Sequence, residues 1–156
     1  MQDFRRLIVW ARAHAFALDV RRAVRTFPRS GYAELRSQLT AAAESIAHNI
    51  VEGAAASSRK EFARFLDVSI KSTSEAEYQL QLAHDYEIVS NEVWRSLTEE
   101  VIEIRRMLYG LRRTVLNADR REQQSRRQEA KPSQKDVKSE RPSRDLQTGP
   151  RTTSRE

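Results

Sequence analysis

The sequence has no cysteine, only four glycines and four prolines, and few aromatic residues. Without cysteine the chain has no disulfide framework and no thiolate site, as is usual in a reducing compartment. Tight β-turns and phosphate-binding loops need glycine and proline, so their scarcity disfavours β-sandwiches and nucleotide-binding α/β enzymes. The uncharged apolar run at 7–11 is far too short for a signal peptide or a membrane span. We therefore expect a cytoplasmic, helical protein that has no contact with a membrane.

The C-terminal part of the chain differs in composition from the rest. Residues 119–156 hold three of the four prolines, one valine, one leucine, no aromatic residue, and 11 Lys or Arg against 7 Asp or Glu. Such a segment cannot bury enough apolar surface to offset the entropy of ordering. We therefore expect one domain at 1–118 and a tail at 119–156 that is disordered beyond its first turns. The tail is either a basic arm for nucleic acid or a solvating segment of mixed charge.

Apolar residues recur at helical spacing throughout the expected domain, and no stretch alternates as a half-buried strand does. The clearest seam runs through 97–115, and a second runs through 35–50 and ends near Gly53, a candidate C-terminal cap. A third helix begins at Ser58, which forms a capping-box signature with Glu61. With the N-terminal segment and short connections, these helices predict an all-α, up-down-up-down antiparallel four-helix bundle with a disordered C-terminal tail.

The first predicted helix has two apolar faces. One stripe consists of Phe4, Leu7, Ile8, Ala11, Ala15 and Leu18. The other, nearly opposite at 100° per residue, consists of Val9, Ala13, Phe16, Val20, Val24 and Phe27. A four-helix monomer needs only one of them, and a large exposed apolar face usually marks an interface. We interpret the second stripe as a candidate oligomer interface. The alternative is a helix buried more deeply in its own chain.

Two polar residues near the end of the second helix have expected structural roles. Asn49 lies at the edge of the apolar seam, where its amide would pin the register of the bundle or the end of the helix. The charge of Glu52 opposes the helix dipole, so a compensating cation is expected, with Arg59 and Lys60 as candidates across the turn.

The sequence shows no catalytic or metal-binding pattern. A di-metal bundle needs Glu-x-x-His pairs, which the chain lacks, and its histidines, His14, His48 and His84, fall on three different predicted helices. No glycine-rich phosphate loop is present, and no serine, histidine and acid combination has a supporting motif. We therefore expect no enzymatic activity, no cofactor and no metal.

Arginine strongly outnumbers lysine in the expected domain. The candidate nucleic-acid-binding residues are Arg95, Arg105, Arg106, Tyr109, Arg112 and Arg113 on the fourth helix, with Arg5, Arg12, Arg21 and Arg22 on the first. Guanidinium groups suit phosphate contacts, and a tyrosine among them can stack a base. We expect the glutamates of the fourth helix, Glu92, Glu99, Glu100 and Glu103, to lie on its other side. The alternative is a solvated face with salt bridges between neighbouring helices.

Four segments, in order, resemble the four-helix-bundle family that includes proteins encoded in intervening sequences of bacterial 23S ribosomal RNA. They are "LIVWARAHAFALDV", "FPRSGYAELRSQLTAAAESIAHNIVEG", "SSRKEFARFLDVSIKSTSEAEYQLQLA" and the closing heptads, together roughly 4–116. The accessory variability determinant of diversity-generating retroelements belongs to the same family. The resemblance implies a homopentamer with a basic surface, no enzymatic activity and, in the retroelement branch, a reverse transcriptase and nucleic acid as partners.

Family-typical residues at the corner between the second and third helices include Asn49, Glu52, Gly53, Ser58 and Glu61. The run 54–56 departs from the family by replacing a commoner glycine-and-arginine turn with alanines. We expect a non-catalytic, oligomeric accessory protein that binds nucleic acid with little sequence specificity. It would partner a reverse transcriptase or associate with ribosomal RNA. The alternative is a protein-interaction scaffold whose arginines bind acidic protein partners.

Overall fold

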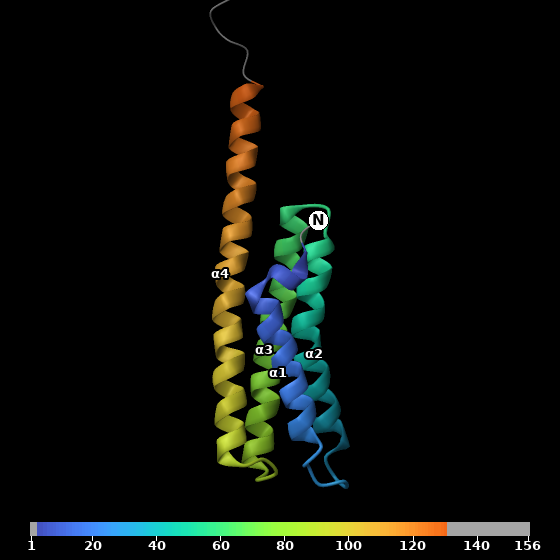
Figure 1. Ribbon diagram of the computed structural model, residues 1–156. Coiled ribbons are helices and arrows are strands. Elements are labelled where there is room, and N and C mark those ends of the chain that lie inside the picture. The colour runs from blue at the N-terminus through green and yellow to red at the C-terminus, as the bar shows by residue number, and fades with distance from the viewer. Residues whose placement is uncertain (1–2, 131–156) are drawn as a thin grey trace, which may run out of the picture.

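The computed structural model describes residues 3–130, which form a short 3-10 helix and four α-helices. The elements are η1 (Phe4–Arg6), α1 (Ile8–Val24), α2 (Ala33–Ala55), α3 (Arg59–Asp85) and α4 (Asn91–Glu129). Successive helices run in opposite directions, and contacts join α1 to α2, α2 to α3, α3 to α4 and α4 back to α1 (Figure 1). The predicted up-down-up-down bundle is confirmed.

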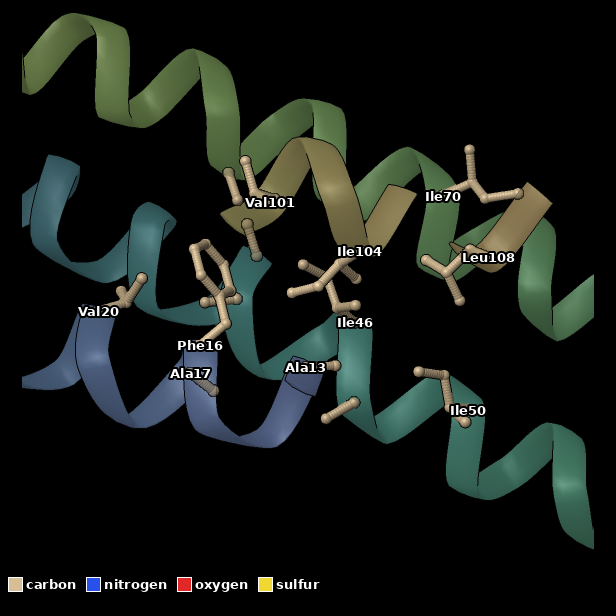
Figure 2. Close-up of a cluster of buried hydrophobic side chains, with 14 of the residues drawn as sticks. Ala13, Phe16, Ala17, Val20, Ile46, Ile50, Ile70, Val101, Ile104 and Leu108 are labelled. Carbon is tan, nitrogen blue, oxygen red and sulfur yellow. The ribbon is translucent and has the colours of Figure 1, made fainter. Parts of the chain in front are cut away.

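The apolar seams predicted from helical spacing form the core of the bundle. Figure 2 shows side chains from several helices meeting there. Eight of those it labels are fully buried: Ala13, Phe16, Val20, Ile46, Ile50, Val101, Ile104 and Leu108. The third helix contributes three buried hydroxyl residues, Ser69, Ser72 and Thr73. Ser69 donates to the backbone carbonyl of Ile46 at 2.9 Å and Thr73 to that of Ile70 at 2.6 Å, so neither of these two hydroxyls is left unpaired.

The inner face of α1 corrects the predicted oligomer interface. Val9, Ala13, Phe16, Val20, Val24 and Phe27 are each at most 8% exposed within their own chain. They are therefore not available to a second subunit, and the interface prediction chose the wrong face. The opposite stripe is the exposed one, with Ile8 at 74% and Leu18 at 45%. Both stripes have the same helical spacing, so only the packing against the neighbouring helices distinguishes them.

The corner between α2 and α3 is held by Ser58 and Glu61. The side chain of Ser58 accepts a hydrogen bond from the backbone N–H of Glu61 at 3.1 Å, as the capping box predicts. The Glu61 carboxylate reaches one residue further back than expected, because it accepts the backbone N–H of Ser57 at 3.0 Å. Two side chains thus accept hydrogen bonds from backbone N–H groups at the start of α3.

Gly53 does not cap α2, because the helix continues to Ala55. A Cβ on Gly53 would lie 2.5 Å from Cδ2 of Phe62 and 3.0 Å from Cβ of Phe65. The missing side chain therefore lets α3 approach α2 closely at this corner. The predicted capping role of Gly53 is therefore wrong. Its actual role depends on packing between two helices, which local sequence does not show.

Asn49 belongs to a small polar network between α2 and α3. Its Nδ2 donates to the backbone carbonyl of Ser45 at 2.8 Å, and it lies 3.0 Å from the hydroxyl of the same residue. That hydroxyl lies 2.9 Å from the hydroxyl of Ser72 on α3. This is the kind of contact that the predicted register role requires.

The predicted partner of Glu52 is wrong. Its carboxylate lies 3.2 Å from Nε2 of His48, one turn back on α2, rather than beside a cation across the turn. Arg59, one of the two expected partners, pairs instead with Glu122 of α4. The reason is that α4 passes this corner, which the sequence did not indicate.

The last helix is longer than the predicted domain. α4 has 39 residues against 27 in α3, a difference of about 18 Å at 1.5 Å per residue. Its C-terminal part rises past the α2–α3 corner (Figure 1). Residues 119–129, which we assigned to the tail, are helical, and the bonds of Gln123 to Asp119 and Arg126 to Glu122 follow helical i to i+4 spacing. The rest of the predicted tail, 131–156, lies outside the described residues.

Candidate nucleic-acid interface

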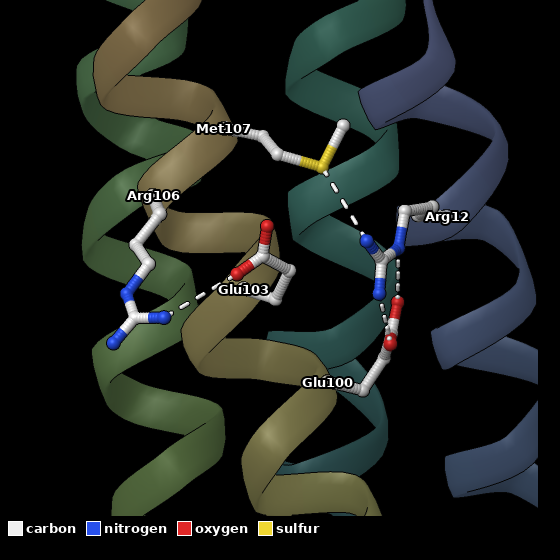
Figure 3. A network of polar contacts seen from close by, with 5 residues as sticks. All are labelled: Arg12, Glu100, Glu103, Arg106 and Met107. Carbon is white, nitrogen blue, oxygen red and sulfur yellow. Dashed lines mark hydrogen bonds and ion pairs between the residues drawn. The ribbon is translucent and has the colours of Figure 1, made fainter.

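The charges of α4 are separated along its axis. Four of its six glutamates precede Ile104, and the stretch from there to Ala118 has four arginines and no acidic residue. The carboxylate of Glu103 lies 3.5 Å from the guanidinium of Arg106 (Figure 3), so the two share a face. The expectation that the glutamates lie on the other side of the helix is therefore wrong for Glu103. The helix begins acidic and becomes basic.

A groove runs along α4 in this basic stretch. It is lined by Arg106, Tyr109, Gly110, Arg113, Asn117 and Arg120, with Arg112 and Leu116 also in its wall. We call it the arginine groove. The residues at 106, 113 and 120 follow one another at seven-residue intervals, so their side chains share one face at steps of about 10.5 Å. None of the described residues that line it is acidic.

The cations of the arginine groove are largely free for an external ligand. The side chain of Arg106 is exposed, and its contact with Glu103 is on the surface, where ion pairs are weak. Within residues 3–130, Arg113 and Arg120 have no carboxylate within 4.0 Å. Tyr109 is 57% exposed. Fixed positive charges beside an accessible aromatic ring can bind phosphates and stack a base.

Arg12, another candidate nucleic-acid-binding residue, is engaged in an ion pair within the bundle. Its Nε and Nη2 donate to the two carboxylate oxygens of Glu100 at 2.8 and 2.6 Å, joining α1 to α4 (Figure 3). This hydrogen bonding raises the pKa of Arg12 above its ordinary value, and the negative charges of Glu100 and Glu103 add to the effect. A guanidinium held in this way is not free to bind phosphate.

Two arginines of α4 are likewise tied to α3. Arg105 pairs with Glu77, and Arg112 forms an ion pair with Asp67, in which its Nη2 donates to the carboxylate at 3.1 Å and its Nε lies 2.6 Å from it. For Arg105 and Arg112, these pairs agree with the alternative of salt bridges between neighbouring helices. Arg112 is shared, since it also lies in the wall of the arginine groove.

The remaining candidates do not line the groove. Arg5 lies 3.9 Å from Asp3, Arg21 pairs with Glu44 at 3.0 Å, Arg22 pairs with Asp19, and Arg95 is exposed on the acidic half of α4. The structure therefore brings together only part of the predicted set. Sequence reasoning missed Gly110, Asn117 and Arg120. The seven-residue spacing of the arginines was the signal that could have found Arg120.

A second surface is apolar and lies on the outer face of α1. We call it the outer stripe, and its exposed members are Ile8, Ala11, Ala15 and Leu18. Beside it, the rings of Phe4 and Trp10 meet edge to face at 4.8 Å, and Trp10 stacks on His14 at 5.3 Å. Two large aliphatic side chains are thus left exposed on one helix.

The described part of the chain lacks the features of two further classes of site. Among residues 3–130, no three histidine or carboxylate side chains are placed so that they could share a metal ion. No helix in the same part combines the length and the apolar character that crossing a membrane requires.

Comparison with known proteins places the fold. Residues 5–110 match the model of the family described as 23S rRNA-intervening sequence protein. Among solved structures, the chain resembles a protein of unknown function from the S23 ribosomal protein family of Bacteroides thetaiotaomicron VPI-5482. The two are 25% identical, the match covers 67% of this chain and 97% of the other, and the TM-score is 0.63. No match was found among curated proteins. The chain belongs to the 23S rRNA-intervening sequence protein family.

Proposed function

We propose that this protein is a non-catalytic accessory protein that binds the phosphate backbone of nucleic acid, with ribosomal RNA as the first ligand to test. The arginine groove carries the proposal, because it presents cations without carboxylates in its lining and an exposed tyrosine on one helix face. The family adds an rRNA-related context. Backbone contacts of this kind confer little sequence specificity.

The proposal implies a definite salt dependence. If Arg106, Arg113 and Arg120 each neutralise one phosphate, the logarithm of the binding constant should fall with the logarithm of salt concentration with a slope of about −2 to −3. A binding constant that does not change between 50 and 200 mM salt would contradict the proposal.

Charge reversal of the groove gives the direct test. The double variant Arg106→Glu/Arg113→Glu should bind RNA at least about tenfold more weakly in fluorescence anisotropy, since it loses two phosphate contacts and gains repulsion. The control is Arg25→Glu, which changes an exposed arginine at the end of α1. An equal loss in the control would show that only net charge matters, and the groove would not be the site.

We propose further that copies of the chain associate through the outer stripe of α1. The support is the exposure of Ile8 and Leu18, together with the pentamer that the family resemblance implies. Association would multiply the arginine groove into a larger positive field.

The competing function is a protein-interaction scaffold whose arginine surface binds acidic protein partners rather than nucleic acid. The exposed apolar side chains of α1 favour it, because they suit a protein surface better than a nucleic acid. The charge-reversal variant separates the two functions. Loss of RNA binding with intact assembly supports the first, and loss of a protein partner alone supports the second.

A further inference from the structure

Gly110 has no role inside the chain that explains it. It lies within the long helix α4, where glycine is the least favourable residue apart from proline. A Cβ built on Gly110 meets nothing within 4 Å, in contrast to Gly53, whose Cβ would collide with Phe62. No neighbour among the described residues requires the missing side chain. The space beside Gly110 therefore lies open toward the solvent.

This open space is part of the arginine groove and adjoins the exposed Tyr109. Arg106 precedes Gly110 by one helical turn and Arg113 follows it by nearly one turn, so cations flank the space along the helix. Glycine allows a ligand to approach the backbone more closely than any other residue does. An aromatic face, a bare stretch of backbone and flanking cations match the base, sugar and phosphates of a nucleotide.

We propose that the arginine groove contains a nucleotide subsite, in which an unpaired base stacks on Tyr109 over Gly110 while Arg106 and Arg113 hold the adjacent phosphates. The ligand is therefore a single-stranded segment of nucleic acid. In a duplex the bases are stacked on one another, and only the phosphates are available to the groove. This inference rests on the proposed function and adds to it the requirement for an unpaired base.

A second copy of the chain is a poorer occupant. The groove is cationic, so a partner must present negative charge there, whereas the apolar outer stripe of α1 has Arg12, Arg21 and Arg22 on the same helix. Nucleic acid supplies negative charge at every phosphate, as well as a flat ring for Tyr109.

The experiment uses the full chain and four 12-nucleotide probes. These are oligouridylate, its deoxy counterpart, a ribose-phosphate strand lacking bases, and a fully paired RNA duplex. Tyr109→Ala should weaken binding of both single strands that have bases by roughly 5- to 100-fold, the usual effect of losing one stacked base. Tyr109→Phe keeps the ring and should bind nearly as wild type. Binding of the strand without bases and of the duplex should change little in either variant.

Gly110→Gln tests the bare backbone separately. Glutamine favours a helix and fills the open space, so the variant should fold, as checked by circular dichroism, and should lose affinity for the same two single strands. The matched control is Ser96→Gln, which adds the same side chain at an exposed position of α4 outside the groove, and it should bind as wild type. If Gly110→Gln does not fold, the comparison of Tyr109→Ala with Tyr109→Phe still tests the nucleotide subsite.

The outcomes distinguish the two proposals. If Tyr109→Ala and a folded Gly110→Gln bind every probe as wild type, while Arg106→Glu/Arg113→Glu loses binding, the nucleotide subsite is wrong and phosphate binding stands. If wild type binds none of the probes, both fail. A Tyr109→Ala variant whose sedimentation changes while its RNA binding does not would make the groove a subunit contact, which also overturns the subsite. Different affinities for the two single strands would identify RNA or DNA as the preferred source of the ligand.

Discussion

Gly53 and Gly110 both lie inside helices, where glycine costs about 1 kcal/mol relative to alanine. Their surroundings differ, because the first is pressed against Phe62 and the second borders open space. We expect Gly53→Ala to lower the free energy of unfolding by about 1–3 kcal/mol, since the added methyl forces the buried ring aside. Gly110→Ala should raise it by up to about 1 kcal/mol. Urea unfolding monitored by circular dichroism measures both. Equal stability of the two variants would mean that the α2–α3 corner relaxes around the methyl.

Arg12 is expected to stabilise the fold through its pair with Glu100. Arg12→Lys keeps the charge but cannot make both hydrogen bonds to Glu100, so it should lower the free energy of unfolding by about 1 kcal/mol. A raised pKa means that the pair loses its contribution only at strongly alkaline pH, so the difference from wild type should not change between pH 6 and 9. RNA binding should be unaffected. A loss of RNA binding without a loss of stability would show instead that Arg12 contacts the ligand.

The helices show which features local sequence could predict. The seams of α2, α3 and α4 were predictable because apolar residues at 3.6-residue spacing have one way to face a core. The length of α4 was not, because residues 119–129 extend the helix through polar i to i+4 pairs rather than through a seam. Which of the two apolar stripes of α1 faces the core was also not predictable, since this depends on how α1 packs against α2 and α4. Ion-pair partners such as Glu122 for Arg59 depend on three-dimensional packing alone.

The extension of α4 past the bundle contacts the α2–α3 corner through Glu122. Glu122 pairs with both Arg59 of α3 and Arg126 of its own helix. We expect Glu122→Gln to speed amide hydrogen exchange in 119–129 severalfold, because each surface pair contributes about 0.2–1 kcal/mol to holding the helix. Exchange in the core of α2 should stay the same. If both regions exchanged faster, the pair would support the whole bundle instead.

The outer stripe of α1 predicts self-association of the protein. Ile8→Asp/Leu18→Asp should shift sedimentation at micromolar concentration toward single chains, because each buried side chain contributes about 1.5–3 kcal/mol and a buried charge is unfavourable. The matched control is Val68→Asp, which alters a similarly exposed residue of α3 and should leave the mass unchanged. If the wild-type protein sediments only as single chains, the proposed assembly is wrong.

The position of the basic stretch on the longest helix has a consequence for avidity. In a closed ring whose symmetry axis runs along the bundle, every copy of α4 would point the same way and present its groove within tens of ångströms of the next. A strand released by one subunit would then meet another at millimolar effective concentration. Residence times on long strands would greatly exceed those on short ones, even though each individual contact is weak.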